Sequence, residues 1–130
     1  MNRVIHFEIQ ADNIERAKKF YEKALGWKIE KVMSKDNGPM DYWMIMTDEK
    51  DSKEPGINGG LYERPKDDKH FLFDCTVDVK DIDKSIKDVK ANGGTILREK
   101  MELKGVGFFA AVKDPEGNKF SLMQSTMEQK

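Results

Sequence analysis

The stretch 4–30 switches its hydrophobic period from two to 3.6 within a few residues, and this switch constrains the fold more than any other feature of the chain. Its first eight residues alternate apolar and polar side chains, which predicts a strand with one apolar and one ionisable face. The apolar face carries Ile5, Phe7 and Ile9, and the ionisable face carries His6, Glu8 and Gln10.

A helix is expected directly after this strand, because the apolar residues now recur every three or four positions. They form one stripe of Ile14, Ala17, Tyr21 and Leu25. Asp12 or Asn13 can cap the start of the helix, and Gly26 supplies its end. A second strand is expected over Trp27–Met33. Such a unit covers one face of its sheet with the helix and leaves the face of His6 uncovered.

The same pattern returns 68 residues later, with a strand, a helix that opens at Asp81 and ends at Gly93, and a further strand. The remaining strand-like runs are 39–48, 57–63, 107–114 and 119–124. Within them, Gly59 and Gly60 mark a bulge or a close approach of another group to the backbone. Each half therefore reads βαβββ, and since one half is small for a core, two must pair. We predict one α+β domain over residues 1–130, made of modules 1–63 and 70–126 and the linker 64–69.

Composition excludes several classes of function. The 130 residues hold 23 basic and 24 acidic side chains, and their net charge of −1 comes without a basic stripe, which argues against nucleic-acid and anionic-membrane partners. The sequence shows no charged-then-apolar leader and no apolar run near 18 residues, so we expect a cytoplasmic protein. Cys75 is the only cysteine, and a buried core position suits it better than a catalytic role.

Four segments together resemble the glyoxalase/bleomycin-resistance/dioxygenase group, the vicinal oxygen chelate superfamily. They are HFEIQADNIERAKKFYEKALGWKIE, GINGGLYERP, TVDVKDIDKSIKDVKANGGTIL and GVGFFAAVKDPEGNKFSLMQ. The resemblance is strongest to small proteins related to lactoylglutathione lyase. It implies two βαβββ modules whose sheets curl into a mixed-sheet cup, with the helices outside and a ligand or metal inside, and it implies a homodimer.

The resemblance also implies where a metal would bind, because metal-using members take one ligand from the first and one from the last strand of each module. His6 matches the first position, and Asp74 stands at its repeat counterpart. Ser121 stands at the last-strand position of the second module, and Asn58 or Gly59 at that of the first. A catalytic metal usually needs about three protein ligands. We therefore predict no metal cofactor and assign no metal ligand.

Without a metal, the polar side of the cup is the expected ligand site. His6 near Asp74 can act as a general base, or the two side chains can simply satisfy each other at the module interface. The predicted substrate-binding residues are Glu8, Trp43, Met46, Thr76, Phe109, Ser121 and Met123. Alternation allows only one of Trp43 and Met44 to face the cup, and aromatic or methionine side chains on strands are often plain core.

We therefore expect a glyoxalase-like protein that binds a small organic molecule in the cup, as a lyase or isomerase with His6 as the acid or base. A first alternative is a non-catalytic protein that sequesters a toxic compound, as in the bleomycin-resistance branch. A second alternative is a metal-dependent lyase or dioxygenase, against which the missing ligands argue.

Overall fold

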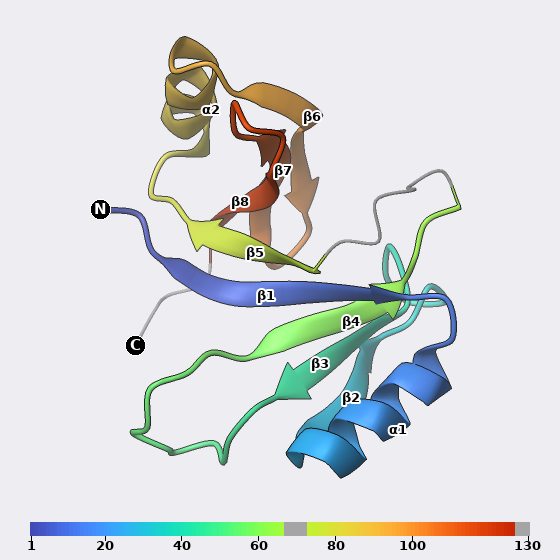
Figure 1. The fold of residues 1–130 in the computed structure, drawn as a ribbon. Helices are drawn as coiled ribbons and strands as arrows, with labels where there is room; N and C mark the ends of the chain where they lie inside the picture. The colour runs from blue at the N-terminus through green and yellow to red at the C-terminus, as the bar shows by residue number, and fades with distance from the viewer. Residues whose placement is uncertain (67–72, 127–130) are drawn as a thin grey trace. The chain divides into compact units, whose positions relative to one another are not determined.

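The computed structural model describes residues 1–66 and 73–126, and the chain in it falls into two compact units (Figure 1). The N-terminal unit is His6–Phe73, and the C-terminal unit is Asp74–Lys130 together with Met1–Ile5. The predicted linker 64–69 and the start of the predicted module 70–126 extend into residues 67–72, which lie outside the described part. His70, the second histidine of the chain, lies outside it as well.

The N-terminal unit has the predicted βαβββ order. Its elements are β1 (Val4–Ala11), α1 (Ile14–Leu25), β2 (Lys28–Met33), β3 (Tyr42–Met46) and β4 (Gly59–Glu63). The strands lie in the order β2-β3-β4-β1, and β1 pairs with β4 in parallel while the other pairs are antiparallel. Because a parallel pair needs a long crossover, the whole segment from α1 to β3 separates β1 from β4.

The C-terminal unit repeats this architecture. Its elements are β5 (Phe73–Asp78), α2 (Ile82–Ala91), β6 (Thr95–Leu103), β7 (Gly107–Lys113) and β8 (Lys119–Ser125). The strand order β5-β8-β7-β6 again has one parallel pair, between the first and last strands of the unit. The α+β fold class and the two βαβββ modules are therefore confirmed. β6, the strand expected after the second helix, is nine residues long, and its register against β7 shifts twice.

Each helix covers one face of its own sheet. Asn13 caps α1 by accepting a hydrogen bond from the backbone N–H of Arg16, and Gly26 ends it with a φ of 74°. Under α1 lies a core of Phe7, Ile9, Ala11, Ile29, Ile45 and Leu61. Ile14, Ala17 and Tyr21 pack against this core as predicted, whereas Leu25, the fourth residue of the predicted stripe, is 56% exposed.

In the C-terminal unit Asp81 caps α2, and Ile82 and Ile86 are buried against a second core. The other buried members of this core are Val79, Ala110, Val112 and Leu122. In both units the strand residues between the core positions point away from the helix, since side chains alternate along a strand. These two faces opposite the helices hold most of the polar side chains that the sequence marks as candidates.

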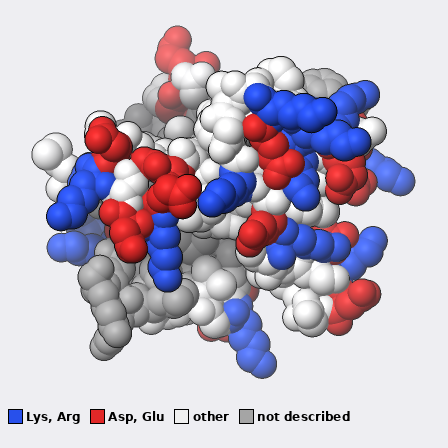
Figure 2. All heavy atoms as spheres, turned by 90° about the horizontal axis from the view of Figure 1, so that it is seen from below, with Lys and Arg blue, Asp and Glu red and all other residues white. Residues whose placement is uncertain are grey.

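Neither helix in the described part of the chain is long and apolar enough to cross a membrane. Lys and Arg side chains are interspersed with Asp and Glu over the surface that Figure 2 shows. This view agrees with the nearly balanced composition and shows no single-sign field on that side of the molecule.

Candidate functional site

Three ionisable side chains of the N-terminal unit converge on the face opposite α1. The Nε2 atom of His6 lies 2.8 Å from the hydroxyl of Tyr42, and that hydroxyl donates to both carboxylate oxygens of Glu8 at 3.0 Å. The same Nε2 lies 3.2 Å from Oε1 of Glu8. The His6 and Glu8 side chains are 23% and 20% exposed. We call His6, Glu8 and Tyr42 the His6 cluster.

Local structure brings the cluster together. His6 and Glu8 are two residues apart on β1, so they share a face but their backbones hold the side chains apart. Tyr42, at the start of β3, reaches across β4 and joins their ends. It can do so because Gly60 lies between, paired with Glu8 on one side and Met44 on the other. A Cβ atom at residue 60 would overlap the phenol oxygen and ring of Tyr42.

Further polar contacts continue along this face. The Tyr42 and Tyr62 rings are stacked, with their centroids 6.5 Å apart and their planes inclined by 23°. Gln10 donates a hydrogen bond from Nε2 to the Tyr62 hydroxyl at 2.8 Å. The face thus combines acid–base groups with a pair of aromatic rings.

The sequence missed Tyr42, which is the centre of this cluster. Its signal was the glycine pair on β4, which predicted a bulge or a close approach of another group to the backbone. The structure shows the close approach. Gly59 is approached by the Phe7 ring and Gly60 by the Tyr42 phenol. What the sequence did not reveal is which side chain approaches, because Tyr42 and Gly60 are 18 residues apart and meet only through strand pairing.

Trp43 and Met46, both predicted to contact the ligand, lie on opposite faces of β3. Trp43 packs against the core under α1, and the ammonium of Lys31 lies 5.2 Å from the centroid of its ring. Met44 and Met46 alternate with Trp43 and Ile45 and so point to the face of the His6 cluster. This placement corrects the choice of Trp43 over Met44 and leaves Met46 on the expected face.

In the C-terminal unit the remaining predicted residues gather on the face opposite α2. Thr76 on β5 is paired with Ser121 on β8, and both are buried. Phe109 on β7 is paired with Met123 on β8, whereas Phe108 packs against the core on the other face. The roles predicted for these residues in ligand binding stay predictions.

Asp74 is buried, and its Oδ2 atom lies 3.6 Å from the ammonium of Lys119. His6 has its own carboxylate neighbour, Glu8, within the N-terminal unit. The predicted pairing of His6 with Asp74 stays a prediction.

The donor set does not fit the divalent metal that the fold family implies. Glu8 and Thr76 are 68 residues apart and are paired with Gly60 and Ser121, so Gly60 is the counterpart of Ser121 in the N-terminal unit. The predicted counterpart, Asn58 or Gly59, was therefore wrong by one or two residues. Glycine offers no ligand, and the space beside it is taken by Tyr42. Among residues 1–66 and 73–126, no group of three or more His, Cys, Asp and Glu is placed to hold a metal ion.

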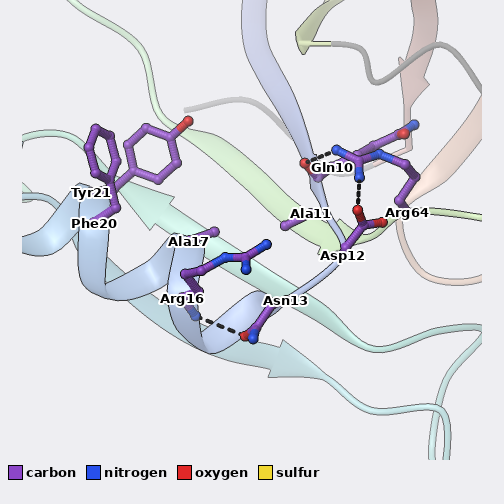
Figure 3. Close-up of a pocket in the computed structure, with 9 residues that line it drawn as sticks. All are labelled: Gln10, Ala11, Asp12, Asn13, Arg16, Ala17, Phe20, Tyr21 and Arg64. Atoms are coloured by element: carbon purple, nitrogen blue, oxygen red, sulfur yellow. Dashed lines mark hydrogen bonds and ion pairs between the residues drawn. The ribbon is translucent and has the colours of Figure 1, made fainter.

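A concavity lies at the start of α1, away from the His6 cluster (Figure 3). Phe20 and Tyr21 border it from the helix, and Arg64 borders it from the end of β4. The Arg64 guanidinium is held by the Asp12 carboxylate at 2.6 Å and by the carbonyl of Gln10 at 3.4 Å. Arg64 and Asn13 thus already have partners within the chain, and their contacts tie together the ends of β1, β4 and α1.

Comparison with known proteins identifies the family to which the chain belongs. Residues 3–122 match the Glyoxalase/Bleomycin resistance protein/Dioxygenase superfamily. The match covers most of the chain and both βαβββ units, so the protein belongs to this superfamily.

Its sequence relatives include enzymes named lactoylglutathione lyase. The chain is 27% identical to a probable chloroplastic lactoylglutathione lyase of Arabidopsis thaliana, over 94% of this chain but only 35% of that protein. It is also 27% identical to the lactoylglutathione lyase of Neisseria meningitidis, over 94% of this chain and 90% of that protein. The chain thus spans about a third of the plant relative and nearly all of the bacterial one.

Solved structures show the same fold. A hypothetical protein of Bacillus halodurans aligns with a TM-score of 0.71 at 17% identity, over 99% of this chain and 98% of that one. Methylmalonyl-CoA epimerase of Mycobacterium tuberculosis aligns with a TM-score of 0.67 at 15% identity, over 95% of this chain and 88% of that one. At such identities the likeness concerns the fold alone.

Proposed function

We propose that the His6 cluster binds a small organic molecule and exchanges a proton with it, as a lyase or isomerase would. The observation that carries this proposal is the convergence of His6, Tyr42 and Glu8 within 3.2 Å of one another on a face that the helix leaves uncovered. An imidazole that lies beside a carboxylate and a phenol is a common arrangement for acid–base catalysis.

The chemistry needs no co-reactant. A C–H bond next to a carbonyl group breaks, its proton moves to the imidazole of His6, and the electron pair stays on the substrate as an enolate. The proton then returns to the same carbon, which inverts or restores it, or to the neighbouring atom, which isomerises the molecule. Glu8 favours the imidazolium that forms in between, because a nearby negative charge stabilises a positive one.

The relatives suggest a class of substrate for this site. Lactoylglutathione and methylmalonyl-CoA, which stand in the names of the lyase and the epimerase, are both acyl groups carried on a thiol. We therefore propose an acyl thioester or a related carbonyl compound as the substrate of this chain. Lewis-acid catalysis by a metal is not part of the proposal, because the ligand set does not fit one.

Deuterium exchange tests the proposal whatever product the reaction forms. The protein is incubated in D2O with lactoylglutathione or methylmalonyl-CoA, and proton NMR follows the hydrogen next to the carbonyl group. We expect incorporation with the wild type and with His70→Gln, the matched control at the other histidine, and none with His6→Gln. Equal incorporation with His6→Gln would exclude His6 as the acid or base, and no incorporation by the wild type with either probe would count against the substrate class.

Sequestration without catalysis is the second candidate, and the stacked pair of Tyr42 and Tyr62 beside the Glu8 carboxylate favours it. Two aromatic rings and one negative charge suit a flat cationic compound. This candidate predicts a ligand that raises the unfolding temperature of wild type and His6→Gln alike, since binding to the folded state stabilises it by mass action. It also predicts no exchange of substrate hydrogen.

A further inference from the structure

We infer that Tyr42, admitted by Gly60, keeps a hydrogen on Nε2 of His6, so that Nδ1 is the basic nitrogen of the neutral imidazole. Tyr42 is in this view a positioning residue, and Gly60 is the residue that gives it room. The assignment of the hydrogen rests on geometry alone. Only its consequence for catalysis rests on the function proposed above.

His6, Tyr42 and Glu8 make three short contacts that must share a limited number of hydrogens. Nε2 of His6 approaches the Tyr42 hydroxyl at 2.8 Å and Oε1 of Glu8 at 3.2 Å, and the hydroxyl approaches the Glu8 carboxylate at 3.0 Å. An ionised carboxylate only accepts hydrogen bonds, and a phenol has one hydrogen to give. The hydroxyl donates that hydrogen to Glu8, so its oxygen can only accept from His6.

The alternative tautomer leaves this arrangement short of hydrogens. With the hydrogen on Nδ1, the bare Nε2 would face a carboxylate oxygen at 3.2 Å, and the single phenol hydrogen would have to serve both His6 and Glu8. Two acceptors would then oppose each other at hydrogen-bonding distance. With the hydrogen on Nε2, two hydrogens serve the three contacts and no acceptor faces another.

Gly60 makes the arrangement possible through space rather than through backbone conformation. It is not among the glycines with positive φ, so its backbone would accept an L-residue. The obstacle is Tyr42, whose phenol occupies the position of the missing Cβ. Gly60→Ala therefore displaces the hydroxyl without deleting it, whereas Tyr42→Phe deletes the hydroxyl and keeps the ring.

The consequence concerns the direction of proton transfer. When Nδ1 takes a proton, Nε2 still carries its hydrogen towards Tyr42 and Glu8, so the imidazolium is stabilised without any movement of these side chains. The substrate must then approach the Nδ1 edge of His6, because Nε2 is engaged with Tyr42 and Glu8.

Long-range 1H–15N NMR of the uniformly 15N-labelled protein without any ligand tests the inference. The spectra are recorded at a pH at which His6 is neutral, and His70→Gln assigns the two histidines. We expect an unprotonated Nδ1 and a protonated Nε2 for His6 in the wild type. In both Tyr42→Phe and Gly60→Ala we expect the Nε2 resonance to shift and its hydrogen to exchange with water at least about tenfold faster, since a bond to an acceptor is lost.

Tyr21→Phe is the matched control, because Tyr21 lies on the helix-covered side of the same unit and should leave the His6 signals unchanged. A hydrogen on Nδ1 in the wild type would overturn the inference outright. So would His6 signals in Tyr42→Phe that match those of Tyr21→Phe. Since no substrate is present, this result is independent of the deuterium exchange, and either can fail while the other stands.

Discussion

The two units share one topology but differ in what stands at equivalent positions on the face opposite the helix. The N-terminal unit has His6, Glu8 and Gly60 where the C-terminal unit has Asp74, Thr76 and Ser121. In the first, the side chains meet around a tyrosine from β3. In the second, Thr76 and Ser121 are buried side by side, and the carboxylate of Asp74 faces Lys119.

The buried positions under the helices are apolar in both units. Leu61 on β4 and Leu122 on β8 are equivalent in register and are both buried in their cores. The core-facing residues keep the βαβββ topology in both units, because burial of their apolar surface stabilises it. The opposite face is under no such constraint, so one unit can hold an acid–base cluster while the other cannot.

Removal of a core side chain should have the largest effect, in either unit. Phe7→Ala opens a cavity between β1 and α1 and should lower the free energy of unfolding by about 3–5 kcal/mol, and Leu122→Ala should lower it by about 2–5 kcal/mol. Urea denaturation measures both. A loss below about 1 kcal/mol for one of them would show that the two cores are not equivalent.

The adjacent glycines of β4 should respond differently to a methyl group. At Gly59 the added Cβ would lie 2.6 Å from the Phe7 ring and from its carbonyl oxygen, so Gly59→Ala should cost about 1–3 kcal/mol. At Gly60 the nearest atoms belong to the Tyr42 side chain rather than to backbone, and this side chain can move, so Gly60→Ala should lower the free energy of unfolding by less.

A double-mutant cycle sharpens this comparison. In a Tyr42→Ala background, Gly60→Ala should cost nothing further, since the side chain it displaces is gone. In the same background Gly59→Ala should still lower the free energy of unfolding by as much as it does in the wild type. If the losses in free energy of unfolding of Gly60→Ala and Tyr42→Ala add up in the double variant, the placement of the phenol over Gly60 is contradicted.

A smaller effect on stability is expected when an aspartate is replaced in either of two turns, one in each unit. The Asn118 side chain, followed by backbone N–H groups, donates hydrogen bonds to Asp114 and lowers the pKa of this carboxyl. Ser52 and the backbone of Glu49 do the same for the pKa of Asp48. A folded-state pKa below the unfolded one stabilises the protein above the unfolded value, and this stabilisation disappears as pH falls through the folded value.

The difference in unfolding temperature between wild type and Asp114→Asn should therefore be present at about pH 7 and vanish at about pH 2. Asp48→Asn should behave alike. Thermal unfolding followed by circular dichroism at both pH values checks this. A difference that grows on acidification would have the wrong sign for a lowered pKa.

Much of the fold could be predicted from the sequence, because the core residues impose their period on it. The switch from alternation at Phe7 and Ile9 to a helical stripe at Ile14 and Ala17 gave β1 and α1 to within a few residues. Leu25, the fourth residue of the predicted stripe, is the exception, because it is 56% exposed although it follows the same period. Period alone does not tell how far a partner element reaches.

The site could be predicted only in part. Alternation placed His6 and Glu8 on one face, and the glycine pair indicated a close approach to the backbone. The identity of the approaching side chain depended on the register of β3 against β4, which pairs Gly60 with Met44 and leaves Tyr42 two residues away on the same face. Strand register is not readable from one strand. The same limit explains the wrong choice of Trp43, whose face depends on where β3 begins.

The most direct measurement for the central claim is urea denaturation of His6→Ala beside Phe7→Ala, two neighbours on the same strand that point to opposite faces. If the face of His6 serves function and the face of Phe7 serves stability, His6→Ala should change the free energy of unfolding by no more than about 1 kcal/mol, while Phe7→Ala lowers it by about 3–5 kcal/mol. A loss in His6→Ala that equals the loss in Phe7→Ala would contradict the account and make the His6 cluster part of the structural framework.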